Sequence, residues 1–344
     1  MKKSIKILII IAFVKSCIIE DLIFEDFSDC PEIIRVHFIF DPNPANVAET
    51  IDIKEVDRMR LYVFSRDGIF LREYEDTNIA DFADIQDFNN NYFIEIKDEL
   101  PDGLPILLPE RYKFVAWGGK DEYYYNTGYQ YETSDQLVFE PGVTTIDEVL
   151  FRLKVHGNEV TELLPIIFNG EIDTRVQRQN VQRINVPMMQ FSNKITVIAK
   201  GLISDDEYRL VITDNNCTYD ISGSFANERG AVKFDYIADF ENGGSGAKTA
   251  TLNKKRLSAD RDVPEIRIFN SAGDLIFPID EFPGDVNLVR FIESVYHDVN
   301  FDVTRNFEIV IDFGEGYPTK TKVTITINGW ETVRTQEDDL EIPF

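Results

Sequence analysis

The residue types that carry out catalysis are sparse in this sequence, and their spacing matches no known reactive pattern. The only imidazoles are those of His37, His156 and His297. The patterns GxSxG, HExxH, GxxxxGK[ST] and GxGxxG are absent, and the glycine-rich residues 242–246 lack the flanking strand and helix of a phosphate loop. The 61 acidic residues offer so many carboxylate pairs that none stands out. We therefore predict a non-enzymatic protein without a catalytic residue, a metal site or a cofactor.

One cysteine lies where its thiol could be modified. A basic start at residues 1–3 is followed by an unbroken apolar run over residues 7–14 and then by Ser16 and Cys17. The run is shorter than the roughly 20 residues that span a bilayer, but it has the length of a signal-peptide core. A small residue before cysteine at this point resembles the lipobox of bacterial lipoproteins, in which the thiol accepts a diacylglyceryl group as a thioether.

We therefore predict a signal peptide over residues 1–16, acylation of Cys17, and a lipidated tether over residues 17–29. Lys15 departs from the apolar or small residue usual at that place. An ordinary cleaved signal peptide with an incidental cysteine is the alternative. For Cys30 and Cys217, both a disulfide and two buried free thiols are open.

The charge of the chain excludes some partners. The chain carries −26, and the four lysines that precede Cys17 account for +4, so the remainder carries −30. Such a field repels phosphate backbones and anionic lipid headgroups. We expect no nucleic-acid partner, and we expect any membrane attachment to be covalent or hydrophobic.

The elements that would hold any site are mostly strands. Val36, Phe38 and Phe40 alternate with polar neighbours, and Asp67-Gly68 is a favoured hairpin turn. Residues 288–296 have helical spacing, and residues 144–153 suggest a second short helix. The hairpin-like segments 61–71 and 266–276 resemble one another, as two domains of related topology would explain, although chance would explain it equally. Many short strands without alternating helices predict an all-β protein built of sandwiches.

Aromatic residues supply the candidate contacts for a ligand or a partner. Trp117, Tyr123 and Tyr125 lie at the end of a predicted strand and in the tyrosine-rich segment 123–131. Exposed aromatic faces stack on sugars and peptides, but tyrosines of this kind can equally cover a sheet edge.

Three parts of the chain together resemble one family. They are residues 17–21 (CIIED) with 27–31 (FSDCP), residues 61–70 (LYVFSRDGIF) with 108–119 (LPERYKFVAWGG), and residues 325–330 (ITINGW). In this order they are similar to the FimB-type anchor and accessory subunits of Bacteroides-type fimbriae, and the resemblance covers nearly the whole chain.

The resemblance implies a surface-exposed lipoprotein of the outer membrane with two transthyretin-like β-sandwich domains in tandem. We assign these domains to residues 30–165 and 166–344. It further implies a structural subunit that joins other fimbrial subunits by β-strand addition and reaches host proteins or glycans through the fimbria. The alternative function is a surface glycan-binding lipoprotein that uses Trp117 and the tyrosine segment as its platform.

Overall fold

The computed structural model describes the chain between residues 33 and 334, with gaps. The described residues are 33–40, 53–77, 79, 82–97, 107, 109–119, 124–128, 139–153, 158–177, 181–203, 205–215, 218–226, 233–243, 246–259, 263–278, 287–297, 299–301, 304–314 and 323–334. They form 21 strands, two short α-helices and two 3-10 turns. The predicted fold class, all-β with β-sandwiches in tandem, is confirmed.

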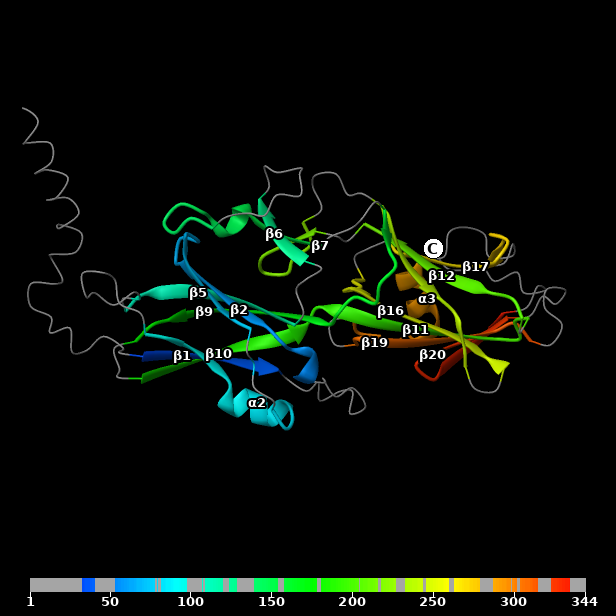
Figure 1. Ribbon diagram of the computed structural model, residues 1–344, viewed down its shortest axis with the longest axis horizontal. Coiled ribbons are helices and arrows are strands. Elements are labelled where there is room, and N and C mark those ends of the chain that lie inside the picture. Colours follow the sequence, from blue (N-terminus) through cyan, green and yellow to red (C-terminus); the bar gives the residue numbers. More distant parts are fainter. Residues whose placement is uncertain are drawn as a thin grey trace, which may run out of the picture.

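Four sheets make two lobes that lie side by side along the long axis (Figure 1). In the first lobe, a seven-stranded sheet faces a three-stranded sheet. The seven-stranded sheet has the order β3 (Phe70–Asp76), β2 (Met59–Ser65), β5 (Arg111–Gly119), β9 (Ile167–Arg175), β10 (Val181–Gln190), β1 (Ile33–Phe40) and β4 (Phe93–Ile96). The three-stranded sheet has the order β13 (Thr218–Asp220), β7 (Val149–Leu153) and β6 (Tyr124–Gly128).

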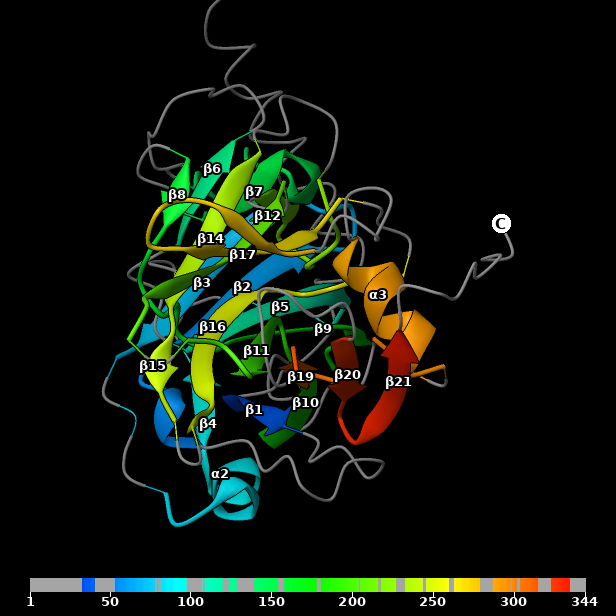
Figure 2. The ribbon, with the colours of Figure 1, turned by 90° about the vertical axis from the view of Figure 1, so that its right-hand side faces the viewer.

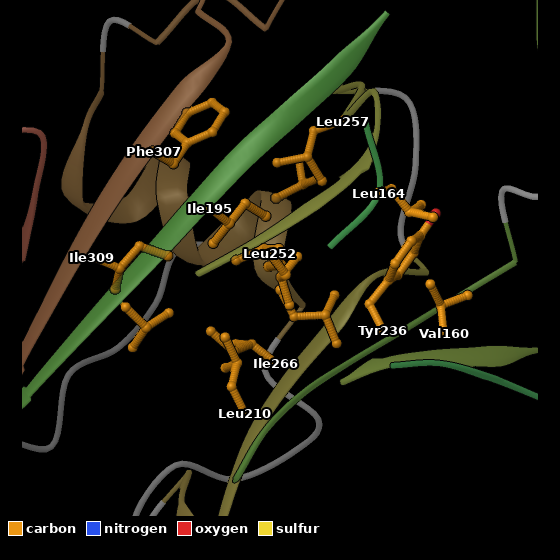
Figure 3. Packing of buried hydrophobic residues seen from close by; sticks show 14 of the residues in the cluster. Val160, Leu164, Ile195, Leu210, Tyr236, Leu252, Leu257, Ile266, Phe307 and Ile309 are labelled. Atoms are coloured by element: carbon orange, nitrogen blue, oxygen red, sulfur yellow. The ribbon is translucent and has the colours of Figure 1, made fainter. Parts of the chain in front are cut away.

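The second lobe packs a six-stranded and a five-stranded sheet face to face. One has the order β15 (Glu241–Asn242), β16 (Lys248–Lys255), β11 (Ser192–Lys200), β19 (Asn306–Asp312), β20 (Val323–Ile327) and β21 (Trp330–Arg334). The other has the order β18 (Leu275–Phe277), β17 (Glu265–Asn270), β12 (Tyr208–Asp214), β14 (Phe234–Asp239) and β8 (Glu159–Val160). Figure 3 shows apolar side chains from both sheets meeting between them, with Ile195 and Ile309 from one sheet and Leu210 and Ile266 from the other.

The large sheet of the first lobe is buried on both faces around its centre. Leu61 and Val63 of β2 join the core on the side of helix α2 (Ile85–Asn91), whereas Tyr62 and Phe64 join the core that continues into the second lobe. Figure 1 shows α2 on one side of the sheet and β6 and β7 on the other. Because successive strand residues point to opposite faces, an apolar run of this kind is typical of a strand covered on both sides.

The two lobes exchange strands. β8 precedes β9 in the sequence but pairs with β14 of the second lobe, and β13 follows β12 but pairs with β7 of the first lobe. Only Phe191 separates β10 in the first lobe from β11 in the second. The chain therefore passes from the seven-stranded sheet to the six-stranded sheet at Phe191, after β9 and β10. The division of the chain into 30–165 and 166–344 stays a prediction.

The resemblance between segments 61–71 and 266–276 extends to their geometry. Both form hairpins at a sheet edge, β2–β3 and β17–β18, and both ladders shift register at the equivalent place, between Val63 and Phe64 and between Ile268 and Phe269. Gly68 and Gly273 adopt positive φ values of 77° and 85°, which only glycine tolerates readily. A shared topology of the two hairpins accounts for the sequence resemblance better than chance does.

The helices agree with the sequence only in part. The predicted helix is α3 (Leu288–Val295), capped by Asn287, and it buries five apolar side chains beside β20 and β21 (Figure 2). The short helix predicted over 144–153 is wrong, since the segment forms one 3-10 turn (Ile146–Glu148) and strand β7. Another 3-10 turn spans Ile53–Glu55. Helix α2, which the sequence analysis missed, begins at the cap Asp84.

A fully buried ion pair joins the two sheets of the second lobe. Lys254 Nζ of β16 lies 2.8 Å from Asp214 Oδ2 of β12, and the two side chains are 0% and 1% exposed. Lys254 Nζ also donates to the carbonyl of Lys255 at 2.9 Å. Because desolvation offsets much of the attraction between two buried charges, the pair fixes the relative position of the sheets more than it adds stability.

This ion pair gives an asymmetric stability prediction. Lys254→Met alone should lower the free energy of unfolding by about 3–5 kcal/mol, because the buried Asp214 carboxylate loses its lysine. The double variant Lys254→Met with Asp214→Leu should regain most of that loss. Urea unfolding of the three proteins measures both effects, and a double variant as unstable as the single one would contradict the assigned role.

Candidate functional site

Two of the four predicted site residues, Cys17 and Tyr123, lie outside the described part of the chain. His156 and the two other cysteines, Cys30 and Cys217, lie outside it as well. Tyr125 is placed only as a backbone position, the second residue of β6, which is an edge strand of the three-stranded sheet. Of the predicted contact residues, Trp117 alone has a described side chain.

Trp117 lies in the core where the two lobes meet. Its side chain on β5 is 5% exposed, and the indole stacks on Phe151 of β7 with ring centroids 3.8 Å apart. The edge of Phe191, the residue between β10 and β11, meets the indole at 5.2 Å. The indole Nε1 donates to the carbonyl of Ile221 at 2.9 Å. A buried indole presents little surface to a sugar or a partner, and a contact role for Trp117 stays a prediction.

Polar groups complete this junction between the lobes. Asn169 Nδ2 on β9 donates to the carbonyls of Ala116 and Ile221, at 3.2 and 3.3 Å. Gly223, with a φ of 88°, lies so close to the Asn169 side chain that a Cβ there would overlap it. The chain from the second lobe thus approaches the first sheet closely because residue 223 is glycine.

Basic side chains are buried beside the same aromatic rings. Lys255 Nζ lies 4.2 Å from the centroid of Tyr219 and 5.2 Å from that of Phe151, an arrangement typical of cation–π attraction. Burial lowers the pKa of the neighbouring Arg256. Two lysines and an arginine at the end of a strand, Lys254 to Arg256, are the sequence signal that could have predicted this cluster.

The histidines show no catalytic arrangement within the described residues. His37 is buried beside Phe93, and burial, followed by the nearby guanidinium groups of Arg183 and Arg35, lowers its pKa. His297 is exposed at the end of α3. Among these residues no three His, Cys, Asp or Glu side chains lie together as metal ligands would. The described helices are likewise too short to cross a membrane.

Edge strands of the described sheets have an evident means of binding another chain. An edge strand offers a row of backbone N–H and C=O groups to an added strand, and charged side chains oppose such addition. β3 is protected in this way, because Glu73 and Glu75 form ion pairs with Arg60 of β2, at 3.9 and 3.3 Å. β4 (FIEI), β6 (YYNTG) and β21 (WETVR) carry fewer charges and are four or five residues long. These three strands are the candidate docking edges.

The role of Trp117 in the junction can be measured directly. Trp117→Ala should cost about 3–5 kcal/mol of unfolding free energy through the cavity it leaves. Trp117→Phe keeps an aromatic ring but loses the N–H donor, and should cost about 1 kcal/mol. Denaturant titrations give both values. A Trp117→Ala protein of unchanged stability would indicate that the indole acts at the surface instead.

The sequence and the fold match known fimbrial proteins. The family model for fimbrillin-A associated anchor proteins Mfa1 and Mfa2 matches residues 27–335. The fimbrial anchor protein Mfa2 from Porphyromonas gingivalis has a similar structure, with a TM-score of 0.64 at 18% identity over 88% of this chain and 99% of that one. No curated protein sequence matches the chain significantly.

Two further solved structures share the fold. A candidate polysaccharide-binding protein from Bacteroides thetaiotaomicron has a TM-score of 0.65 at 19% identity, covering 90% of this chain and 99% of that one. A candidate adhesin from Bacteroides ovatus has a TM-score of 0.65 at 15% identity, covering 90% and 100%. These structural similarities show the fold. The family model, which covers most of the sequence, shows the family membership. The chain belongs to the family of fimbrillin-A associated anchor proteins Mfa1 and Mfa2.

Proposed function

We propose that this protein is a non-enzymatic subunit that anchors fimbriae to the cell surface or regulates their assembly. The observation that carries the proposal is the match of residues 27–335 to a family of fimbrial anchor proteins. The burial of Trp117 leaves little aromatic surface for a sugar. The positions of β4, β6 and β21 at the edges of the described sheets accord with a protein that binds other chains. Its partners are then other fimbrial subunits, and its place is the outer membrane beneath the fimbria.

The proposed means of joining other subunits is β-strand addition. An added strand gains main-chain hydrogen bonds along the edge, and pockets for alternate side chains set its register. β4 suits this role in the first lobe and β21 in the second, because these edge strands carry only one and two charged residues respectively. The β3 edge is the least suited, since its four charged residues oppose an added strand.

The proposed means of attachment to the membrane is a lipid on Cys17. The chain after Cys17 carries −30 and cannot adhere to anionic headgroups by charge. A single acyl chain binds a bilayer only weakly, and stable attachment takes two or more. A diacylglyceryl thioether on Cys17 would meet that requirement and leave both lobes outside the bilayer.

Gene deletion followed by complementation tests the proposal. In the deletion strain we expect fimbriae that are detached, abnormally long or absent, because their base has lost its anchor. Complementation with the unaltered gene should restore attachment, whereas Cys17→Ala should release the protein into the medium or the periplasm. Electron microscopy scores the fimbriae, and immunoblots of membrane and soluble fractions locate the protein.

A second cysteine provides the matched control for that experiment. Cys30→Ala removes a thiol that is not expected to be acylated, so this protein should remain with the membrane. Unchanged fimbriae in the deletion strain would refute the anchoring role. Membrane retention of Cys17→Ala would refute the lipid attachment alone.

A further inference from the structure

One nearly continuous strand crosses both lobes. β10 and β11 together run from Val181 to Lys200, and only Phe191 lies outside their ladders. The backbone remains bound even there, since Phe191 N donates to the carbonyl of Ile167 at 2.6 Å. Twenty extended residues span roughly 65 Å at the rise of a β-strand. In Figure 1, β10 and β11 follow one another along the long axis of the molecule.

The first half of this strand is held mainly by β1. The pair is parallel and in register over eight residues, from Ile33 with Val181 to Phe40 with Met188. β9 pairs only with residues 188–190 of β10, and Pro187, which lies just before them, has no N–H to donate. Among the described residues, β10 before Met188 is therefore joined by its ladder to β1 alone.

The second half is held by a parallel partner too. β11 pairs with β19 over seven residues, from Lys194 with Asn306 to Lys200 with Asp312. Its other neighbour, β16, is antiparallel over eight residues. Each half of the crossing strand thus has one parallel partner. β1 runs parallel to β10, and β19 runs parallel to β11.

Parallel pairing determines how this arrangement resists tension. When two parallel strands are pulled apart from the N-terminus of one and the C-terminus of the other, they slide along each other. The whole ladder is then loaded at once. When strands are pulled apart sideways, their hydrogen bonds break one after another, and each exchanges for water at a net cost of only about 1 kcal/mol. Sliding therefore requires the larger force.

Tension along the chain loads both parallel pairs in this sliding direction. A pull on the N-terminal side of β1 is opposed by β10, which the second lobe holds from its C-terminal end. A pull from the C-terminal end reaches β19 through the antiparallel strands β20 and β21. It is then opposed by β11, which the first lobe holds from its N-terminal end. We propose that β1–β10 and β11–β19 are two shear-resistant clamps in series, which make this protein a load-bearing link between membrane and fimbria. The source of the load rests on the proposed function.

Asparagine side chains reinforce the inner end of each clamp, where the crossing strand passes between lobes. At the end of β1, Asn89 of α2 accepts from Phe40 N at 2.9 Å and donates to Phe40 O at 2.8 Å. At the start of β11, the wholly buried Asn193 donates to the carbonyls of Thr304 and Arg305 and accepts from Leu257 N. Both side chains add hydrogen bonds to the backbone at the end of a loaded ladder, where shear is greatest.

Single-molecule pulling in two directions tests the clamps. The protein is the full chain with Cys17, Cys30 and Cys217 replaced by alanine. It is stretched either through handles at its two ends or through Asp67→Cys and Lys97→Cys. The latter two positions lie at opposite edges of the seven-stranded sheet, so this pull runs across the strands. We expect the end-to-end pull to need a severalfold higher unfolding force, and equal forces would overturn the proposal.

A pair of substitutions at one position identifies the clamp. The Phe40 amide bonds Asn89, so the Ile39 amide, which points the opposite way, faces β10. Ile39→Pro removes that N–H, whereas Ile39→Ala keeps it. The proline variant should unfold end to end at a clearly lower force than the alanine variant, while their across-strand forces stay alike. Equal end-to-end forces would overturn the clamp.

Neither failure of folding nor failure in cells confuses this test. Circular dichroism shows whether the proline variant folds, and if it does not, the two pulling directions on the parent chain decide the matter. The forces are properties of the isolated protein. The predicted force differences can be absent while the deletion strain still loses its fimbriae, which refutes the clamps alone. They can also be present while the deletion strain keeps its fimbriae, which refutes the anchoring role alone.

Discussion

The passage of one extended backbone from the first lobe into the second, through Phe191, is the constraint on which the rest of the structure depends. β10 needs β1 beside it, and β11 needs β16 and β19, so one strand determines the position of both large sheets. The ring of Phe191 must then be buried at the crossing, and Trp117 and Tyr219 pack against it at 5.2 and 4.7 Å. Two further strand pairs, β8 with β14 and β13 with β7, also join the lobes at this junction. The lobes therefore share one core instead of meeting across a flexible linker.

Local sequence patterns predicted the elements far better than they predicted their partners. Alternation identified β1, and Asp67-Gly68 located the β2–β3 hairpin, because these signals depend on neighbouring residues alone. Even the resemblance between two distant hairpins proved to extend to their register shifts. Helix α2 was missed because its seven residues are mostly polar and rest on one buried side chain, Phe88. Segment 144–153 was misjudged because its apolar residues form a strand whose partners, β6 and β13, lie elsewhere in the sequence.

The candidate site was harder to predict, since exposure depends on tertiary contacts. Trp117 stood near tyrosines and glycines, a setting that suggested a ligand platform, yet its indole is covered by Phe151 from β7. Lys254 and Lys255 were passed over because a fully buried lysine is rare, and only the complete fold supplies the carboxylate of Asp214 and the ring of Tyr219. Acidity and the lipobox-like cysteine, by contrast, are properties of the chain itself. They needed no structure to suggest a protein tethered through its N-terminus.

Three features support a protein that anchors other chains. It belongs to a family of fimbrial anchor proteins, its described sheets have edge strands on which partners can dock, and its lobes cannot separate without breaking strand pairs. The central claim is that the lobes form one cooperative unit joined by residues 181–200. Native-state hydrogen exchange tests this claim most directly. The backbone amides of β10 and β11 should exchange last, at the same opening free energy, together with those of β1 and β19 that they protect. Exchange of the β11 amides at a clearly lower free energy than those of β10 would contradict it, because the second lobe would then open independently.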